Sequence, residues 1–433
     1  MANEKEVFGL PKVIINFRTQ STTAITRSAR GIMVMILKNE TTNTSNYFRI
    51  ADTSDIPATG LTDSNVDLIK KALLGTPLRV LVYTLPLDSV TVGGTAEAGA
   101  GSGATTGDGP SLDDDEEPIA GGASAAVVQE GQDVETKLTQ ADILKKIINV
   151  KWNYICNPTG SAQDQEDLAS WVKAQRNNKR KTFKAVVANV AADHYGIVNF
   201  TTGNIRVTNP EYIDQLREAD GDESKVTVPQ YLKYTANQYT ARITGILAGL
   251  SLDRSATYFE LSEVVDCDTY EDIDSCINNG ELCLFDEQDG NGVKIARACN
   301  SLHTFTTDVG QDFRFIKIIE AIDLIQDDIR DTFKEEYVGK VINDYNHKML
   351  FISAIGVYFR GLKGNVLDAS DTAQNWVDID EPAQKDYAIL HGDKVEDMTV
   401  QQIREYNTGT NVYLTGRITP VNAMEDLKID FVM

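Results

Sequence analysis

Two short stretches near the two ends of the 433-residue chain alternate apolar and polar residues. One face of the last stretch is formed by Leu427, Ile429, Phe431 and Met433. One face of the first stretch is formed by Val13, Ile15 and Phe17. This period of two is typical of a half-buried β-strand. A terminal strand with no hairpin turn beside it needs ladder partners from elsewhere. We expect both strands to pair with another molecule.

Between these stretches, apolar runs alternate with helical patterns. Continuous apolar runs predict buried strands at residues 31–37, 78–85, 151–157 and 183–190. Helical spacing of apolar residues predicts helices at residues 64–74, 141–150 and 163–176. Asp63 or Ser64 is the expected cap of the first helix. Strand, helix and strand in this order predict an α/β fold with a largely parallel sheet.

The second half of the chain has a different pattern. Small and apolar residues from Tyr239 onward predict a helix packed tightly on the sheet, and a Gly-rich turn joins residues 282–285 and 293–298 in a hairpin. A helix after His303 carries an apolar stripe of Ile318, Ile322, Ile325, Ile329 and Phe333. Its other side carries Asp323, Asp327, Asp328 and Asp331. The pattern also predicts a helix at 341–362, a helix at 399–406 that begins with a Thr399–Gln402 capping box, and a strand at 412–419.

The composition changes abruptly between Thr91 and Glu135. This segment is rich in Gly, Ala, Ser and Thr and contains five consecutive carboxylates, Asp113 to Glu117. Such a segment cannot bury a core. The carboxylates could form a cation site, but ligands for a metal need turns between them, so a solvated surface insertion is favoured. The glycine cluster at Gly99–Gly109 lacks the Lys-Ser/Thr ending of a phosphate loop.

Charge and length narrow the possible functions. The chain is long enough for two or three domains, and 42% of its residues are hydrophobic. A formal net charge of -23 argues against binding to nucleic acid or to an anionic membrane. The N-terminus has no apolar core typical of a signal peptide, and the longest apolar run, Met349 to Phe359, is too short to span a bilayer. We therefore expect synthesis in a cytoplasm and no direct membrane insertion.

The densest basic patch of this acidic chain follows one predicted helix. It consists of Arg176, Lys179, Arg180, Lys181 and Lys184. Basic residues at the carboxyl end of a helix interact favourably with its dipole. A solvated helix end is therefore one interpretation, and docking to an acidic protein partner is the other.

Candidate chemistry is sparse. Among the four histidines, only His194 follows a strand of the α/β region, where an active site could lie. The sequence contains no GxSxG nucleophile elbow and no HExxH motif, and no cofactor fingerprint is found. Five cysteines have spacings that match neither CxxC pairs nor a zinc ribbon, so free and mostly buried thiols are expected. The sequence thus predicts no catalytic, cofactor or metal residues.

Several stretches together resemble the contractile tail sheath proteins of Gram-positive phages and of phage-tail-like, R-type bacteriocins. They are FGLPKVIINF, SARGIMVMILK, KWNYICNP with ASWVKAQRNNKRKTFKAVVANVAADHYGIVNFTT, YTARITGILAGLSLDRSATYFEL, and the run from Cys299 through FIKIIEAIDLIQDDIRDTFKEEYVGKVIND to the terminal VNAMEDLKIDFVM. They cover nearly all the chain except the acidic insertion, and they follow the order of the family. No single motif is diagnostic, whereas the ordered set is specific.

The resemblance implies a non-enzymatic, subtilisin-like α/β domain, a C-terminal α+β domain and exchanged terminal strands. It implies domain limits at residues 1–29 for an arm, 30–305 for the sheath domain with an insertion at about 90–137, and 306–433 for the C-terminal domain. The terminal strands would add to a sheet of neighbouring subunits in a helical homo-oligomer. The sheath would surround an inner tail tube protein, meet baseplate and tail terminator proteins, and contract to drive the tube through a target cell envelope.

The resemblance also implies that a helix of the C-terminal domain faces the tube. Candidate tube contacts are Lys340, Lys348, Arg360 and Lys363, and a solvated helix face is the alternative. The acidic insertion is expected on the outside of the sheath. Two other classes of protein remain open, namely an α/β hydrolase that uses His194 and a lattice-forming surface protein, which would require secretion.

Overall fold

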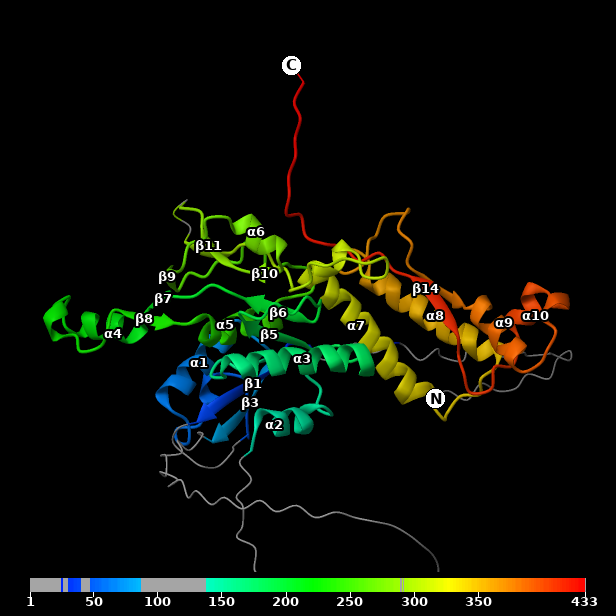
Figure 1. The fold of residues 1–433 in the computed structure, drawn as a ribbon, viewed down its shortest axis with the longest axis horizontal. Helices are drawn as coiled ribbons and strands as arrows, with labels where there is room; N and C mark the ends of the chain where they lie inside the picture. The colour runs from blue at the N-terminus through cyan, green and yellow to red at the C-terminus, as the bar shows by residue number, and fades with distance from the viewer. Residues whose placement is uncertain are drawn as a thin grey trace, which may run out of the picture.

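The structure is a computed structural model, and it describes residue 25 and residues 30–39, 47–86, 138–288, 290 and 292–432. A seven-stranded sheet flanked by helices forms one body, and a mainly helical body follows it in the chain (Figure 1). The predicted strand at Val13–Phe17, the acidic insertion at Thr91–Glu135 and Met433 lie outside the described residues. Within the described part of the chain, every helix is too short or too polar to cross a bilayer.

The main sheet has the strand order β10-β6-β5-β4-β1-β3-β2. Its strands are β1 (Ile32–Asn39), β2 (Tyr47–Ile50), β3 (Arg79–Pro86), β4 (Tyr154–Cys156), β5 (Lys184–Ala188), β6 (Ile197–Phe200) and β10 (Glu281–Leu282). Neighbours pair in parallel, except that β2 runs antiparallel to β3 at one edge. The predicted α/β class is confirmed, and the four predicted buried strands are β1, β3, β4 and β5. The short edge strand β2 was missed because most of its residues are not buried, so it lacks the apolar run that revealed the others.

The remaining elements complete the two bodies. The helices are α1 (Asp63–Leu73), α2 (Gln140–Ile147), α3 (Ala162–Lys179), α4 (Pro210–Glu218), α5 (Ala236–Gly249), α6 (Ile273–Asn278), α7 (Ile316–Thr332), α8 (Tyr345–Leu362), α9 (Glu381–Leu390) and α10 (Val400–Arg404). The small sheets comprise β7 (Ile205–Thr208), β8 (Tyr231–Tyr234) and β9 (Val264–Asp266), the hairpin β11 (Leu284–Asp286) with β12 (Val293–Ile295), and β13 (Trp376–Ile379) with β14 (Leu414–Arg417). The predicted hairpin and the Thr399–Gln402 capping box are confirmed. The first helix is capped by Thr62, not by Asp63 or Ser64.

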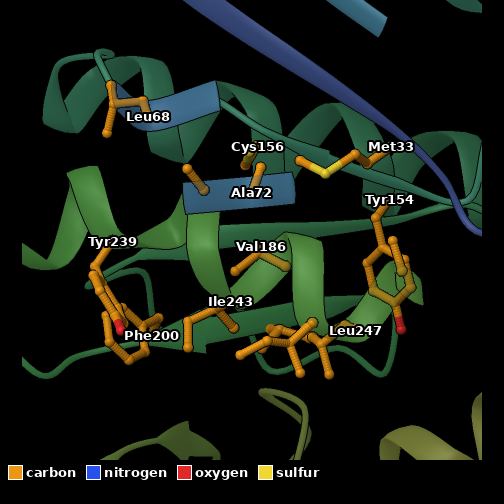
Figure 2. Packing of buried hydrophobic residues seen from close by; sticks show 14 of the residues in the cluster. Met33, Leu68, Ala72, Tyr154, Cys156, Val186, Phe200, Tyr239, Ile243 and Leu247 are labelled. Carbon is orange, nitrogen blue, oxygen red and sulfur yellow. The ribbon is translucent and has the colours of Figure 1, made fainter. Parts of the chain in front are cut away.

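Strand β1 shows why the sheet is buried on both faces. Met33, Met35 and Leu37 join the core cluster beneath α1 and α5, whereas Val34 and Ile36 join the cluster beneath α2 and α3. Figure 2 shows the first cluster, where side chains of α5 pack against the strands. Because successive residues of a strand point to opposite faces, a continuous apolar run fills both cores.

Helix α5 also approaches α1 more closely than side chains allow. A Cβ added at Gly245 would lie 2.1 Å from the carbonyl oxygen of Ala72, and one at Gly249 would lie 1.9 Å from that of Gly75. Only glycine permits this approach of two backbones. The small residues from Tyr239 onward, predicted to pack on the sheet, therefore also bring α5 against α1.

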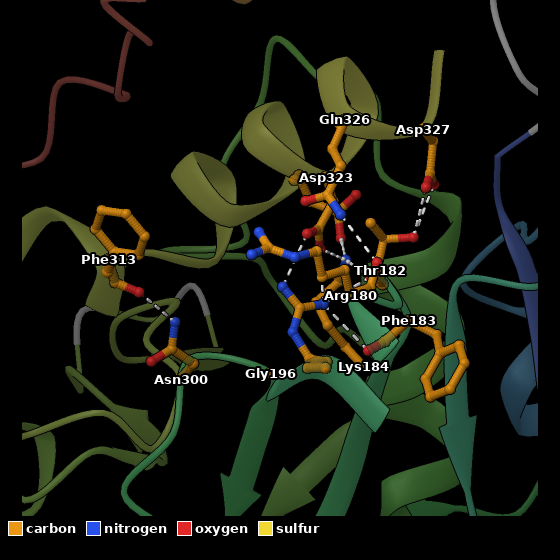
Figure 3. A network of polar contacts seen from close by, with 12 residues as sticks. Arg180, Thr182, Phe183, Lys184, Gly196, Asn300, Phe313, Asp323, Gln326 and Asp327 are labelled. Atoms are coloured by element: carbon orange, nitrogen blue, oxygen red, sulfur yellow. Dashed lines mark hydrogen bonds and ion pairs between the residues drawn. The ribbon is translucent and has the colours of Figure 1, made fainter. Parts of the chain in front are cut away.

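Helix α7 joins the two bodies, and every one of its residues is buried or half-buried. Its acidic side faces the sheet and not the solvent, as Figure 3 shows for Asp323 and Asp327. Asp323 is 2.8 Å from Arg176 Nη2 and 2.8 Å from Lys184 Nζ, and its side chain is 1% exposed. Thr182 Oγ1 donates to Asp327 Oδ1 at 2.7 Å. On the other flank of α7, the Tyr358 hydroxyl of α8 donates to Asp328 Oδ2 at 2.7 Å.

Glu320 extends this network by one turn of α7. Its carboxylate lies 2.8 Å from Lys184 Nζ, pairs with Arg30 and accepts a 2.6 Å hydrogen bond from the Tyr154 hydroxyl. Burial alone would raise the pKa of Glu320, but the charges of Lys184 and Arg30 lower it to about 2. The carboxylate therefore stays ionised across the pH range in which proteins usually work.

The interpretation of the basic patch as a solvated helix end is wrong for Arg176 and Lys184. Both are buried, and their acidic partner lies in the same chain, on α7. Lys179 and Arg180 of the patch are exposed, as a solvated end requires. The solvated-end interpretation therefore holds for Lys179 and Arg180, and docking of the patch to an acidic protein partner stays a prediction.

We predict that Asp323→Ala lowers the free energy of unfolding by about 3–5 kcal/mol, because it leaves Arg176 as an unpaired buried charge and removes one of the two carboxylates beside Lys184. Denaturant unfolding followed by circular dichroism measures this change. Asp214→Ala is the matched control, since it removes an exposed pair with Arg217 and should leave the unfolding midpoint nearly unchanged. Equal midpoints for the two variants would show that the network does not hold α7 on the sheet.

Candidate functional site

His194, the one candidate catalytic residue, has a structural role. Its side chain is buried, Nδ1 accepts a 2.9 Å hydrogen bond from the backbone N–H of Gly196, and Nε2 is 3.2 Å from Asn177 Oδ1. The nearby hydroxyl of Ser301 donates to the backbone oxygen of His194 at 3.0 Å and not to the ring. With both ring nitrogens engaged and no nucleophile hydrogen-bonded to them, the imidazole orders the loop after β5.

The described C-terminal residues, 421–432, form the most unusual surface of the molecule. Residues 427–432 run away from the body without a strand partner among the described residues (Figure 1). The side chains of Leu427 and Phe431 are 86% and 87% exposed, and Met424, Ile429 and Val432 are exposed as well. Soluble monomers rarely present so many contiguous apolar side chains to water, so such a surface marks an interaction site.

The base of this tail is fixed to the body by charge. Arg297 Nη2 lies 2.6 Å from Asp426 Oδ1, and its Nε lies 3.2 Å from Glu425 Oε2. The hydroxyls of Ser255 and Thr257 donate to Glu425 Oε1 at 2.9 and 2.8 Å. Sequence reasoning missed this anchor because Arg297 is far from the tail along the chain. The anchor fixes the point at which the tail leaves the body.

Strands β13 and β14 form a two-stranded antiparallel sheet in the second body. Within the described part of the chain each has one strand neighbour, so the two outer edges have no ladder partner. Val377 and Leu414 of this sheet pack against the core formed by α7 and α8. A two-stranded sheet is only marginally stable by itself and readily takes up further strands.

The four candidate tube contacts are not equivalent. Lys348 is buried within the second body, where its Nζ donates to Gln384 Oε1 at 2.9 Å and to Thr408 Oγ1 at 3.2 Å. A tube contact through Lys348 is therefore contradicted, because the α8 register places this lysine on the inner face. Lys340, Arg360 and Lys363 are exposed and remain candidates.

Comparison with known proteins gives a consistent result. The family model of the phage tail sheath protein central domain matches residues 134–301. The family model of the phage tail sheath C-terminal domain matches residues 308–380. The tail sheath protein of Clostridium phage phiCD119 is 29% identical over 97% of this chain and 98% of its own length.

Two solved structures share the fold. The crystal structure of a sheath tail protein from Desulfitobacterium hafniense is 19% identical, covers 85% of this chain and 93% of its own, and has a TM-score of 0.57. The helical sheath of the anti-feeding prophage in its contracted state is 12% identical, covers 98% of this chain and 99% of its own, and has a TM-score of 0.59.

The exposed apolar tail on a folded α/β body is typical of a protein that assembles with other molecules. The matches to both domains and the full-length relative show that the chain belongs to the phage tail sheath protein family. Its role is that of a structural component of phage tails or phage-tail-like particles.

We predict a specific pH dependence from His194. Burial, with the charge of Arg176, lowers its pKa from 6.5 to about 4. As the pH falls from 6.5 to about 4, the unfolded chain binds a proton at this histidine that the folded chain does not, so the free energy of unfolding decreases. Denaturant unfolding of His194→Gln should show a smaller decrease over this window. The exposed His391→Gln variant should keep the wild-type slope, and identical slopes for all three proteins would contradict the assignment.

Proposed function

We propose that this protein is the protomer of a contractile tail sheath that polymerises helically around an inner tube. On contraction, the sheath drives the tube through a target cell envelope. The single observation that carries the proposal is the apolar tail at residues 427–432, which is anchored at its base and lacks a partner strand in its own described fold.

In this proposal the tail is a donor strand. Burying Leu427, Ile429 and Phe431 against a neighbour would contribute about 1.5–3 kcal/mol for each side chain. Ordering the tail backbone costs about 1–2 kcal/mol for each residue. Apolar burial therefore does not by itself offset the ordering cost of one strand, and a stable sheath needs main-chain hydrogen bonds, repetition of the contact along the helix and other contacts between subunits.

The acceptor in this proposal is the β13–β14 sheet of a neighbouring subunit. Its two edges could receive two strands, the C-terminal donor at Leu427–Met433 and the N-terminal donor at Val13, Ile15 and Phe17. This is β-augmentation, in which main-chain hydrogen bonds give affinity and alternate side chains give register. A head-to-tail contact that does not close produces a filament.

The same proposal assigns the domains. Residues 1–29 form the N-terminal arm, residues 30–305 form a subtilisin-like sheath domain without its activity, and residues 306–433 form the C-terminal domain. The acidic insertion lies on the outer surface of the sheath, and baseplate and tail terminator proteins meet its ends. Synthesis takes place in the cytoplasm of the host bacterium, and the particle is a phage tail or an R-type bacteriocin.

We predict that deletion of Leu427–Met433 leaves a folded monomer and abolishes polymerisation. The side chains of residues 427–432 are exposed in the described monomer, so we expect folding not to depend on them. Analytical ultracentrifugation and electron microscopy measure assembly, and circular dichroism measures folding. A point-variant version is Leu427→Asp with Phe431→Asp, matched by Lys428→Asp on the opposite face as the control. Sheaths formed by the truncated chain would refute strand exchange.

We predict that Arg360→Glu combined with Lys363→Glu prevents assembly on the tube but not self-polymerisation. Both residues lie at the exposed end of α8, where charge reversal leaves the core unchanged. Co-expression with the tube and baseplate proteins, followed by electron microscopy, counts tubes coated with sheath. Lys385→Glu, an exposed lysine on α9, is the control. Normally coated tubes from the double variant would place the tube contact elsewhere.

A further inference from the structure

Three side chains that take no part in the tail anchor or in α8 converge at one edge of the main sheet. They are Cys276 on α6, Glu281 on β10 and Cys283 in the link to β11. The two Sγ atoms and a carboxylate oxygen all lie within 4.8 Å of one another. Cys283 is buried, and the other two are half-buried, so the group has a closed side and an open side.

A third thiol lies beside this group. Cys299 Sγ donates to the backbone oxygen of Glu281 at 3.3 Å, and Cys283 Sγ donates to the same oxygen at 3.7 Å. The two thiols therefore meet at a single oxygen atom, and Cys299 is completely buried. Three of the five cysteines of the chain are thus gathered around one glutamate, although their spacing along the sequence matches no metal-binding motif.

Burial favours the neutral form of the thiols in this group. Burial raises the pKa of the Cys283 thiol to about 12 and that of Cys299 to about 11. The pKa of Cys276 is also raised, first by burial and then by the negative charge of Glu281. A bound cation would counteract both effects, because its positive charge stabilises thiolates in a buried position.

We propose that Cys276, Cys283 and Glu281 form a binding site for a soft divalent metal ion, best fitted by Zn²⁺. Two thiolates and one carboxylate are ligands that zinc accepts in tetrahedral sites, with Zn–S near 2.3 Å and Zn–O about 2.0–2.2 Å. The fourth position is filled by Cys299 after a change of rotamer or by water. Binding releases two protons to solvent, one each from Cys276 and Cys283, and a third where Cys299 is the fourth ligand; thiolate ligands exclude Mg²⁺ and Ca²⁺.

The site would stabilise the part of the fold with the shortest elements. Helix α6 has six residues, and β10 has two and pairs only with β6 in the described structure. The same α6 lines a pocket of about 680 Å³ at the base of the tail, together with Arg297, Glu425 and Asp426. A metal ion would fix α6 to the sheet edge on which the tail anchor rests.

The experiment uses the full-length chain, reduced with a phosphine and incubated with Zn²⁺ before gel filtration. Elemental mass spectrometry of the protein peak should give one zinc for each chain, and thermal unfolding should shift to higher temperature. Cobalt substitution should give a thiolate-to-metal charge-transfer band, because that band requires a bound thiolate. Cys276→Ser, at a half-buried position on a short helix, and Glu281→Gln should each weaken zinc binding at least tenfold.

The matched control is Cys267→Ser, which removes another half-buried thiol that faces Asp266 and Asp268 and not the cluster. It should retain full zinc stoichiometry, and circular dichroism should show that all variants are folded. Three results would overturn the proposal. They are no zinc in the reduced wild-type peak, equal zinc in wild type and Cys276→Ser, and a cobalt complex without the thiolate band.

Discussion

The buried ion network on α7 is the constraint on which the arrangement of this protein depends. Arg176 and Lys184 come from the end of α3 and the start of β5, and both close on Asp323 of a helix that lies about 140 residues later in the chain. Charges removed from water are costly unless they are paired with good geometry, so any other placement of α7 would leave several of them unpaired. The orientation of α7 in turn places α8, the β13–β14 sheet and the start of the tail.

This network is surrounded by apolar packing. The isoleucines of α7 continue into the core of the second body, where Leu324 and Ile325 pack with Phe351 and Ile355 of α8. Helix α7 therefore has two buried sides, one apolar and one charged. Apolar contacts supply most of the stabilisation, whereas the charge pairs select one register and one orientation of the helix.

The paired charges of α7 and the unpaired tail affect the protein in different ways. The described body satisfies its own charges, but it leaves apolar side chains exposed on the segment that follows the Arg297 anchor. Exposure of such a surface to water is unfavourable, and a partner that covers it removes this cost. For a member of the tail sheath family, the partner that is always present at high local concentration is another copy of the same chain. In the proposed strand exchange, the covalent link between the tail and its own body would keep neighbouring protomers connected.

The sequence by itself determined the α/β class, the main buried strands and helices, and the alternation of the tail, because these features arise from local periodicity. It could not determine the partners of buried charges. The acidic side of α7 has the pattern of a solvated face, and only the fold brings Asp323 to Arg176 and Lys184. Tertiary contacts also decided three other features. They are the inward position of Lys348, the hydrogen-bonded ring of His194 and the approach of Cys276 to Cys283. Such contacts join residues that are distant in sequence, and their energies depend on burial and distance, which only the tertiary structure sets.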